Sequence, residues 1–495
     1  MTAFNFETPS RQSAKGIIVN LGVSTYRFIR GTIIIIGAFF IQYIRSDKVY
    51  DFTTPKVIIP AIGFIVFMIV LSILRYRNFK FHVTTEHFVL KQGVFNKEEI
   101  SVAKSKIQNV LIKQNVLQQI INVVSLAIET AGDEKTEIEI TALPREKANA
   151  LKETLLSHQN IERQEIEIET EVFFKASTKL LVLEGITENH LKSFVVIFAF
   201  IVGTYRDLKD FIENLNISNQ IKSNFNLDDE SLMSLLLFNV SIVIVILILA
   251  FLYSLTKTVI QNFNLVVKQK KDDLEISKGL FNKINIGLIA SRLQTTTLTT
   301  NRFKRALGLY QLKFTQAMMN KKQQLKFNII GLNKIKVDEL LERFYPKALP
   351  LVENHKPNSY IIYRVIIISL IPLLIINGFL IFAPPYLYLI NVPIVALLAY
   401  NTYFTYKKLY YSIDDKYVVV GGGALINTTT SFLEISKIQA VTLTQSIFQR
   451  RRGLATVEMH SASKDLNIPH IDMTTALNIK NYLLYKIESE DKDWM

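Results

Sequence analysis

The stretch Lys437–Gln449, KIQAVTLTQSIFQ, occurs three times in this chain in recognisable form. Residues 106–118 read KIQNVLIKQNVLQ, with glutamines at the same three positions, whereas residues 292–304, RLQTTTLTTNRFK, keep only the first glutamine. The sequence therefore predicts three copies of one domain. Fourteen residues after the first glutamine, each copy has a residue type that tolerates a left-handed backbone: Asn122, Gly308 or Gly453.

The composition describes a basic chain with long apolar runs. Its 495 residues exceed what one core accommodates and favour about three domains. Cysteine is absent, which excludes disulfides, zinc–thiolate sites and cysteine nucleophiles. The net charge of +14 fits attraction to anionic lipid or nucleic acid, and equally the cytoplasmic basic bias of a membrane protein. The hydropathy pattern decides in favour of a membrane protein.

Six hydrophobic segments, arranged in three pairs, predict transmembrane hairpins. The uncharged runs 231–256 and 365–406 approach or exceed the roughly 20 apolar residues that cross a bilayer. The first members of the first two pairs are short, but their flanking lysine and arginine side chains can reach the interface. A turn at Ala383–Pro385 separates the last pair. The six segments are 31–44, 57–74, 191–205, 234–255, 365–382 and 387–403.

Each hairpin precedes one copy of the glutamine motif, so the repeating unit is a hairpin followed by a soluble domain. Lysine and arginine concentrate on the soluble-domain side, which places both termini and all three domains in the cytoplasm. A signal peptide is the competing interpretation of the N-terminus, but no small-x-small cleavage site follows 33–41, so we expect an uncleaved first span. The predicted boundaries are an N-terminal segment 1–30, hairpins 31–75, 191–256 and 361–406, domains 76–160, 257–346 and 407–489, and linkers 161–190 and 347–360.

Between the hairpins the apolar period changes toward two, which indicates strands. In each copy a glycine separates two strands, where a hairpin turn needs a positive φ: Gly93, Gly279 or Gly423. A phosphate-binding role for Gly421–Gly423 is the sharper alternative, but the lysine and the helix of such loops are missing. After the motif come one or two helical turns, a strand pair and an amphipathic helix. Each copy is thus predicted to be a small antiparallel β-domain closed by one C-terminal helix.

The hairpin-then-domain order, the strand–Gly–strand opening and the K-I-Q-x-V-x-x-x-Q-x-x-x-Q core resemble the bacterial pleckstrin-homology-type membrane protein family, in particular its triple-repeat (YdbT-like) members. The resemblance covers nearly the whole chain, and copy two departs from it at Thr296, Thr300 and Lys304. With the hairpins, it implies an α+β membrane protein: six transmembrane helices in three hairpins, each followed by a cytoplasmic PH-like β-domain with a C-terminal helix. It also implies a bacterial inner (plasma) membrane location and no enzyme activity.

No pattern of residues predicts a catalytic, cofactor or metal site. The seven histidines are scattered, and without cysteine no spacing brings three or four metal ligands together. The nucleophile elbow, the P-loop and the dinucleotide fingerprint are absent from the sequence. No ionisable residue lies centrally in any of the six segments, which disfavours a transporter or channel.

The later glutamines and a basic run form the candidate interaction surface: Gln114, Gln118, Gln445, Gln449, Arg450, Arg451 and Arg452. The amides can contact a ligand or a neighbouring copy, or they satisfy backbone groups where a strand ends and a short helix begins. For the first glutamine, which all copies keep, we favour that structural role. The arginines suit anionic lipid, whereas the interleaved aromatic residues of a nucleic-acid surface are missing.

We expect a non-enzymatic polytopic membrane scaffold that presents three cytoplasmic PH-like domains for multivalent protein interaction. The expected partner is a protein, with other copies of the chain among the candidates through exposed sheet edges, and not a nucleic acid. The alternative is an anionic-lipid-sensing module that reads headgroups with Arg450–Arg452 and Lys268–Lys271. A transporter-associated subunit is a third and weaker alternative.

Overall fold

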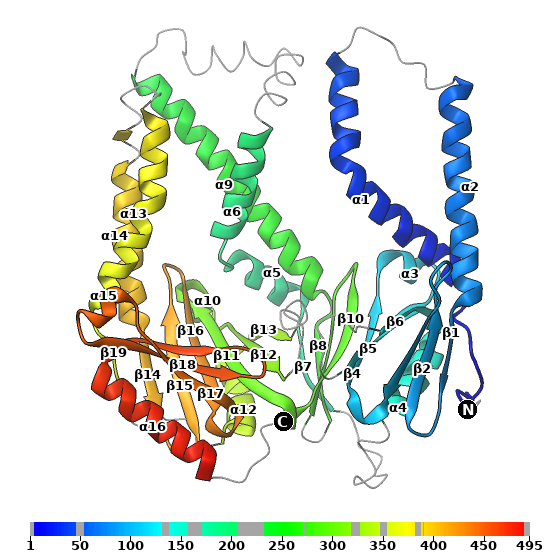
Figure 1. Ribbon diagram of the computed structural model, residues 1–495. Coiled ribbons are helices and arrows are strands. Elements are labelled where there is room, and N and C mark those ends of the chain that lie inside the picture. Colours follow the sequence, from blue (N-terminus) through cyan, green and yellow to red (C-terminus); the bar gives the residue numbers. More distant parts are fainter. Residues whose placement is uncertain are drawn as a thin grey trace. The chain divides into compact units, whose positions relative to one another are not determined.

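The computed structural model describes residues 4–45, 54–130, 138–156, 171–204, 232–270, 273–317, 327–346, 354–381, 388–389 and 391–489 (Figure 1). The chain forms two compact units: unit 1 comprises residues 1–173 and 266–287, and unit 2 comprises residues 174–265 and 288–495. The second repeat is therefore divided between the units. The turn Ala383–Pro385, Lys271 and residues 161–170 of the first predicted linker lie outside the described residues.

Unit 1 consists of a helical pair followed by β-structure. Its helices are α1 (Gly16–Arg45), α2 (Pro55–Asn78), the short α3 (Val116–Ile120) and α4 (Arg145–Leu156). The strands of the first repeat are β1 (Lys80–Val83), β2 (His87–Gln92), β3 (Glu98–Ala103), β4 (Ile107–Gln114), β5 (Val124–Thr130) and β6 (Ile138–Leu143). The second repeat contributes β8 (Val266–Lys270), β9 (Asp273–Lys278) and β10 (Lys283–Leu288), preceded by β7 (Glu171–Lys175) at the unit boundary.

Unit 2 carries the remaining half of the second repeat and the whole third repeat. Its helices are α5 (Thr178–Ile186), α6 (Leu191–Gly203), α9 (Leu232–Asn262), α10 (Arg302–Ala306), α12 (Lys334–Phe344), α13 (Tyr360–Leu380), α14 (Asn391–Lys408), α15 (Ile447–Arg450) and α16 (Met473–Ser489). Its strands are β11 (Leu293–Asn301), β12 (Tyr310–Gln316), β13 (Asn328–Leu332), β14 (Tyr410–Ile413), β15 (Tyr417–Gly423), β16 (Asn427–Glu434), β17 (Ile438–Thr444), β18 (Leu454–Ser461) and β19 (Leu466–Asp472).

Consecutive repeats share a sheet in both units. The order of the shared sheet in unit 1 is β6-β5-β4-β10-β9-β8-β7, and in unit 2 it is β13-β12-β11-β16-β15-β14. Each repeat gives its first three strands to one sheet and its next three to another. The two outer half-sheets, β1-β2-β3 and β17-β18-β19, contain three strands each. The antiparallel β-domains predicted from the sequence are present, but the sequence pattern did not reveal that their sheets run across the repeat boundaries.

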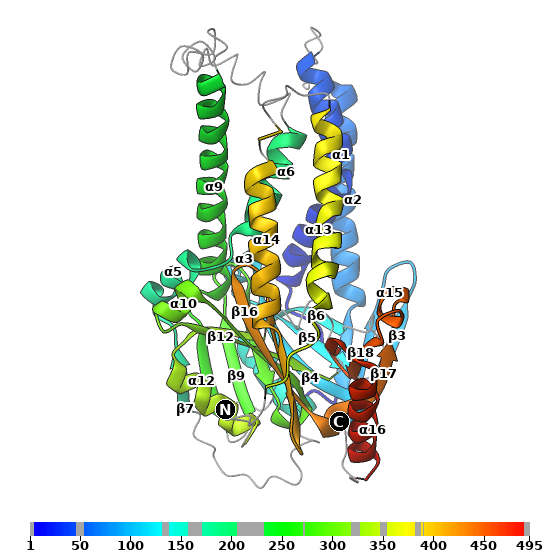
Figure 2. The ribbon, with the colours of Figure 1, turned by 90° about the vertical axis from the view of Figure 1, so that its left-hand side faces the viewer.

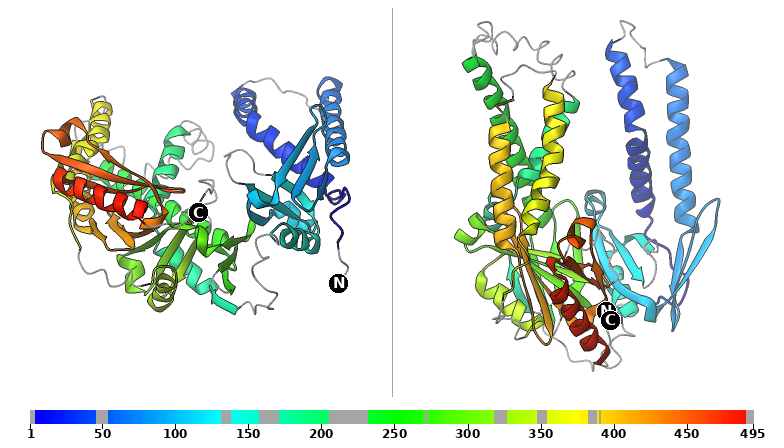
Figure 3. Two further views of the ribbon diagram at one scale, coloured as in Figure 1. Left: turned by 60° about the horizontal axis from the view of Figure 1, so that its bottom comes forward. Right: turned by 60° about the vertical axis from the view of Figure 1, so that its left-hand side comes forward.

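Apolar side chains beneath the C-terminal helices form the core of the repeats. In the first repeat, Phe81, Ile140 and Leu151 of α4 are fully buried in one cluster. In the third, Leu433 and Leu483 of α16 are fully buried in the equivalent cluster, and α16 lies across β17–β19 (Figure 3, left, red helix). Burying each such side chain stabilises the fold by about 1.5–3 kcal/mol. The prediction of a C-terminal amphipathic helix on each β-domain is confirmed.

The left-handed backbone positions predicted from the repeats are also confirmed. Gly93 and Gly279 have φ values of +108° and +110° in the β2–β3 and β9–β10 turns. The short helices end at Asn122, Gly308 and Gly453, with φ values of 54°, 67° and 63°. A Cβ added at Gly279 would overlap the backbone oxygen of Asn282, so this turn depends on glycine.

The prediction of six transmembrane helices is wrong, because fewer helices are long and apolar enough to cross a membrane. Among the described residues, two helices qualify: Ile58–Asn78 of α2 and Val240–Asn262 of α9, with mean hydropathies of 2.5 and 2.4. Only 6% and 17% of their apolar 18-residue stretches are buried, which is far less than in a core helix of a soluble domain. Helix α6, with 13 residues, spans only about 20 Å, and α14 mixes Asn401, Thr402 and lysines into its 18 residues. In unit 2, α9 and α14 extend from the same side of the sheets (Figure 2).

We expect Gly279→Ala to destabilise the protein by about 1–3 kcal/mol, because alanine must adopt a positive φ and displace Asn282. The matched control is Gly287→Ala in β10, where an added Cβ meets open space and no positive φ is present. Thermal unfolding of both variants in detergent measures the effect. Equal midpoints for the two variants would contradict this role of the turn.

Candidate interaction surface around the short helices

The first glutamine of each repeat lies where a strand bulges. The pairing register of β4 shifts between Ile107 and Asn109, and that of β17 shifts between Ile438 and Ala440. An equivalent shift in β11 lies at Gln294. A bulge inserts one extra residue and bends the strand, so the repeated glutamine marks the start of the bent strand. No residue pattern in the chain signals this bulge directly.

The amide of Gln294 does not behave as the sequence interpretation expected. The side chain is 1% exposed, and neither amide atom has a hydrogen-bond partner among the described residues. The interpretation that this amide satisfies backbone groups is therefore wrong for the second repeat. The side chain lies at the register shift of β11, a strand that has neighbours on both sides.

The third glutamine of the motif closes a capping box on the short helix. In the first repeat, Asn115 is the N-cap of α3, and the Gln118 side chain accepts from the Asn115 backbone N–H at 2.8 Å. Ser446 and Gln449 form the same box on α15. The spacing of Ser446 and Gln449 is the sequence signature of a capping box, so this role could have been recognised from the sequence.

The other ends of these two amides are used inside the domains. Gln118 is 2% exposed and donates to Ser125 Oγ at 2.6 Å and to the Thr141 carbonyl at 2.8 Å. Gln449 is 4% exposed and donates to Thr456 Oγ1 at 2.9 Å. These glutamines lie in the interior, where they fix the short helix against the following strands.

The second glutamine bridges the two ends of the short-helix loop. Gln114 donates to the Val123 carbonyl at 2.8 Å, and Gln445 donates to the Leu454 carbonyl at 2.7 Å. Gln445 is nevertheless exposed, and Gln114 is partly exposed. The structure thus uses all four glutamine amides of the candidate surface for internal hydrogen bonds.

The arginines of the candidate surface lie outside, at the end of α15. Arg450, Arg451 and Arg452 are exposed. The guanidinium of Arg452 lies 4.6 Å from the ring centroid of Tyr360, the first residue of α13, which ties it to the helix that leaves the domain. On the same short helix, Ile447 and Phe448 are 73% and 60% exposed. The accessible part of the candidate surface is therefore basic and apolar, and it lies near the start of α13 (Figure 2).

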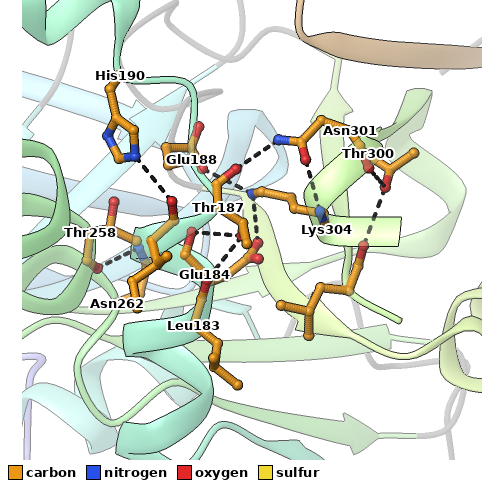
Figure 4. Close-up of polar contacts among 12 residues, drawn as sticks. Leu183, Glu184, Thr187, Glu188, His190, Thr258, Asn262, Thr300, Asn301 and Lys304 are labelled. Carbon is orange, nitrogen blue, oxygen red and sulfur yellow. Dashed lines mark hydrogen bonds and ion pairs between the residues drawn. The ribbon is translucent and has the colours of Figure 1, made fainter. Parts of the chain in front are cut away.

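In the second repeat a buried ion pair replaces the capping glutamine. Lys304 occupies the glutamine position, and its backbone N–H donates to Asn301 Oδ1 at 2.8 Å. Its ammonium lies 2.9 Å from Glu184 Oε1 and 2.9 Å from Glu188 Oε2 (Figure 4). Asn301 also donates to the Thr187 carbonyl at 2.7 Å. The short helix α10 is thereby bound to α5, a helix within the predicted linker 161–190.

Charge compensation keeps this ion pair together. Lys304 and Glu184 are 2% and 1% exposed. Burial alone lowers the pKa of Lys304, but the carboxylates of Glu184 and Glu188 raise it above its ordinary value. Burial raises the pKa of Glu184, and the ammonium of Lys304 opposes that rise. The sequence showed that Lys304 departs from the motif, but the partner, 120 residues earlier, gave no recognisable signal.

In the third repeat a histidine takes part in the capping network. Gln449 donates to His470 Nδ1 at 2.8 Å, and Arg364 Nη1 lies 3.3 Å from His470 Nε2. His470 is 1% exposed and has a φ of 55°. Burial, followed by the charge of Arg364, lowers the pKa of His470 from 6.5 to about 4. In the sequence this histidine is one of seven scattered residues, and its position there does not predict the role.

In the part of the chain that the structure describes, no three histidine, aspartate or glutamate side chains gather as metal ligands would. The polar clusters that do form include the capping networks and the Lys304 ion pair. These clusters stabilise loops. The exposed side chains of the short helices are therefore the groups accessible to a partner.

The shared sheets, closing helices and three capped short-helix loops define three PH-like repeats. The Bacterial PH domain family model matches residues 32–159, 208–347 and 365–487, and the chain therefore belongs to that family. It is 22% identical over 484 residues to the UPF0699 transmembrane protein YdbT of Bacillus subtilis (strain 168), covering 91% of this chain and 92% of that protein. No solved structure matches the chain.

We expect Lys304→Met to destabilise the protein by about 3–5 kcal/mol, because Glu184 stays buried without its cation. In a Glu184→Gln background the same change should cost at least about 1 kcal/mol less. Denaturant unfolding of the four proteins gives the coupling energy. Lys336→Met, at the exposed pair with Glu339, is the control and should cost under about 1 kcal/mol. Additive effects of the two core substitutions would contradict the ion pair.

Acid should weaken the His470 network. Because the folded-state pKa of His470 lies below its ordinary value, the unfolded chain binds more protons as pH falls from 6.5 toward 4. The free energy of unfolding should therefore fall over that window, by on the order of 1–2 kcal/mol. His470→Asn tolerates the positive φ and should remove this part of the pH dependence. If the free energy of unfolding of His470→Asn fell as steeply between pH 7 and pH 4 as that of the unchanged protein, the prediction would be wrong.

Proposed function

We propose that this protein is a non-enzymatic membrane scaffold that presents three PH-like domains for multivalent protein interaction. We place it in the bacterial plasma membrane, with its termini and domains in the cytoplasm. The supporting observation is the repetition itself: three domains of one family belong to a chain whose apolar helices α2 and α9 are exposed along most of their length. Exposed apolar helices of this length need an apolar surrounding.

The proposed mechanism is avidity. Modules tethered to one membrane share an effective concentration far above that in bulk, so contacts that are weak singly become strong together. The short helices supply suitable contact groups, because two apolar residues at each of them are at least half exposed: Phe303 on α10 with Leu307 just after it, and Ile447 and Phe448 on α15. Exposed aromatic and aliphatic groups beside arginine have the chemistry of protein contact sites.

Chemical crosslinking of the tagged full chain in its own membrane, followed by identification of the captured proteins, tests this function. We expect a protein partner whose recovery falls at least fivefold in an Ile447→Asp/Phe448→Asp variant. The control is Ile335→Asp on α12, where the isoleucine is 75% exposed. Capture of no protein above background, or equal losses in the variant and the control, would overturn the proposal.

Anionic-lipid binding is the second candidate function. The observation that favours it is the exposed cluster of Arg450, Arg451 and Arg452 near the start of α13, since basic groups gain about 1 kcal/mol each near an anionic leaflet.

Lipid that co-purifies with the full chain distinguishes this alternative. If the third repeat reads headgroups, changing all three arginines to glutamine should lower the retained anionic lipid while zwitterionic lipid stays unchanged. Equal anionic lipid in both preparations, measured by mass spectrometry, would exclude it.

A further inference from the structure

The two junctions between repeats use one pairing register. In unit 1, Gln114 pairs with Lys283, so the residue six after one motif glutamine faces the residue eleven before the next. In unit 2, Thr300 pairs with Thr428, at the same two offsets from Gln294 and Gln439. Two independent junctions with one register define a rule for how a repeat receives its successor.

One strand of each of the two kinds that pair at a junction lacks a neighbour on one side in the described part of the chain. Among the described residues, β3 pairs only with β2, and β17 pairs only with β18. By the rule, β3 has the position that β10 and β16 occupy, and β17 has the position of β4 and β11. The outer half-sheets therefore carry complementary edges.

Burial along the strands supports this comparison. Where a successor is present, the residue after the motif glutamine is covered: Asn109 is 7% and Thr295 is 2% exposed. The equivalent Ala440 on β17 is exposed, and so is Gln439 beside it. An exposed edge of this kind is a template for another strand.

A second contact accompanies the strand pairing in unit 1. Gln119 on α3 donates to the backbone oxygens of Leu280 and Phe281, at 3.0 and 2.9 Å, in the β9–β10 turn of the following repeat. The equivalent donor on α15 is Arg450, which is exposed. The equivalent turn before β3 holds Phe95, which is 89% exposed, compared with 48% for Phe281. Arg450 and the Phe95 turn, the equivalents of the two sides of this contact, are therefore both exposed.

We propose that β17 and α15 of one copy of this chain bind β3 and its turn in a second copy, by the same register. Ala440 then faces Val102, Thr442 faces Ile100 and Thr444 faces Glu98. The guanidinium of Arg450 donates to the backbone carbonyls of the Phe95 turn, as the Gln119 amide does in the first repeat. This inference rests on the proposed function, because it names the protein partner as a second copy.

The charges at the two edges fit each other. Strand β3 begins with Glu98 and Glu99, and both are exposed. In the proposed register this acidic end faces the end of β17 that leads into Arg450–Arg452. Acidic side chains keep the free edge from pairing indiscriminately, and the basic short helix offsets them in the correct partner.

The contact is head to tail. Each copy uses β17 on one neighbour and leaves β3 for another, so assembly closes into a ring or continues as an open chain. A two-fold dimer would instead place like edges together. Anchoring by apolar helices confines the copies to one membrane, which raises their effective concentration.

The absence of cysteine from the chain makes disulfide trapping selective. Glu98→Cys and Thr444→Cys are introduced in two differently tagged full-length chains, one cysteine in each, co-expressed and mildly oxidised in the membrane. Opposed residues of antiparallel strands have Cβ atoms roughly 4.5–5.5 Å apart, near the reach of a disulfide. Two residues along, on the same face of the corresponding junction, the hydroxyls of Thr297 and Ser431 lie 3.1 Å apart. We expect a covalent dimer containing both tags.

The matched control moves one cysteine by a single residue. Glu99→Cys with Thr444→Cys puts the thiols on opposite faces, so its yield should be at least fivefold lower. Arg450→Gln, which restores the residue type of Gln119, should keep the yield of the Glu98–Thr444 dimer, whereas Arg450→Glu should lower it at least fivefold.

A chain that carries both cysteines should give a series of covalent multimers. Dimers of the Glu98→Cys chain alone, equal yields from both cysteine pairs, or a disulfide closed within one chain would overturn the inference. If none of these dimers forms while crosslinking captures another protein through Ile447 and Phe448, the scaffold function stands and self-association falls. If neither a second copy nor any other protein is captured, both proposals fall.

Discussion

Backbone pairing between β4 and β10, and between β11 and β16, is the constraint on which the rest of the structure depends. A three-stranded half-sheet leaves a row of unpaired N–H and C=O groups at its edge, and such groups are costly to bury without partners. Joining the half-sheets of consecutive repeats satisfies these groups and allows polar residues such as Thr295 and Asn109 to be covered. The register is then fixed at a second point in unit 1, since Gln119 must reach the turn at Phe281.

The departure of the middle repeat from the motif follows from its surroundings. Its strand β11 has neighbours on both sides, and its buried hydroxyls pair within unit 2: Thr296 Oγ1 accepts from the Tyr345 hydroxyl at 3.0 Å. Its short helix meets α5, whose Glu184 brings a buried carboxylate next to position 304. A capping glutamine cannot neutralise that carboxylate, whereas a lysine can. Lys304 is therefore an adaptation to a different neighbour rather than a loss of the capping function, because Asn301 still caps α10.

Local sequence signals predicted the local structure, and contacts far apart in sequence escaped them. The glycine turns, the left-handed helix ends and the closing helices each need a particular residue type at a particular place, so the repeat pattern revealed them. The capping role of Gln449 was visible in its spacing from Ser446. The partner of Lys304, the sharing of sheets and the register of β11 on β16 depend on residues more than 100 positions apart. The expected number of transmembrane helices failed because each hydrophobic segment was counted without asking whether one helix is both long and apolar enough: α6 has 13 residues, and α14 contains Asn401, Thr402 and two lysines.

Two uses are proposed for the basic end of α15, and the contact made at the equivalent position of the first repeat supports protein rather than lipid. Arg452 is already engaged with the ring of Tyr360, so it offers less to a headgroup than its exposure alone implies. Arg450 occupies the position at which the first repeat binds the carbonyls of a neighbouring turn. An arginine side chain has more donors for such carbonyls than a glutamine side chain has. At the junction between the first two repeats, α3 and β4 are the equivalents of α15 and β17, and the following repeat covers them.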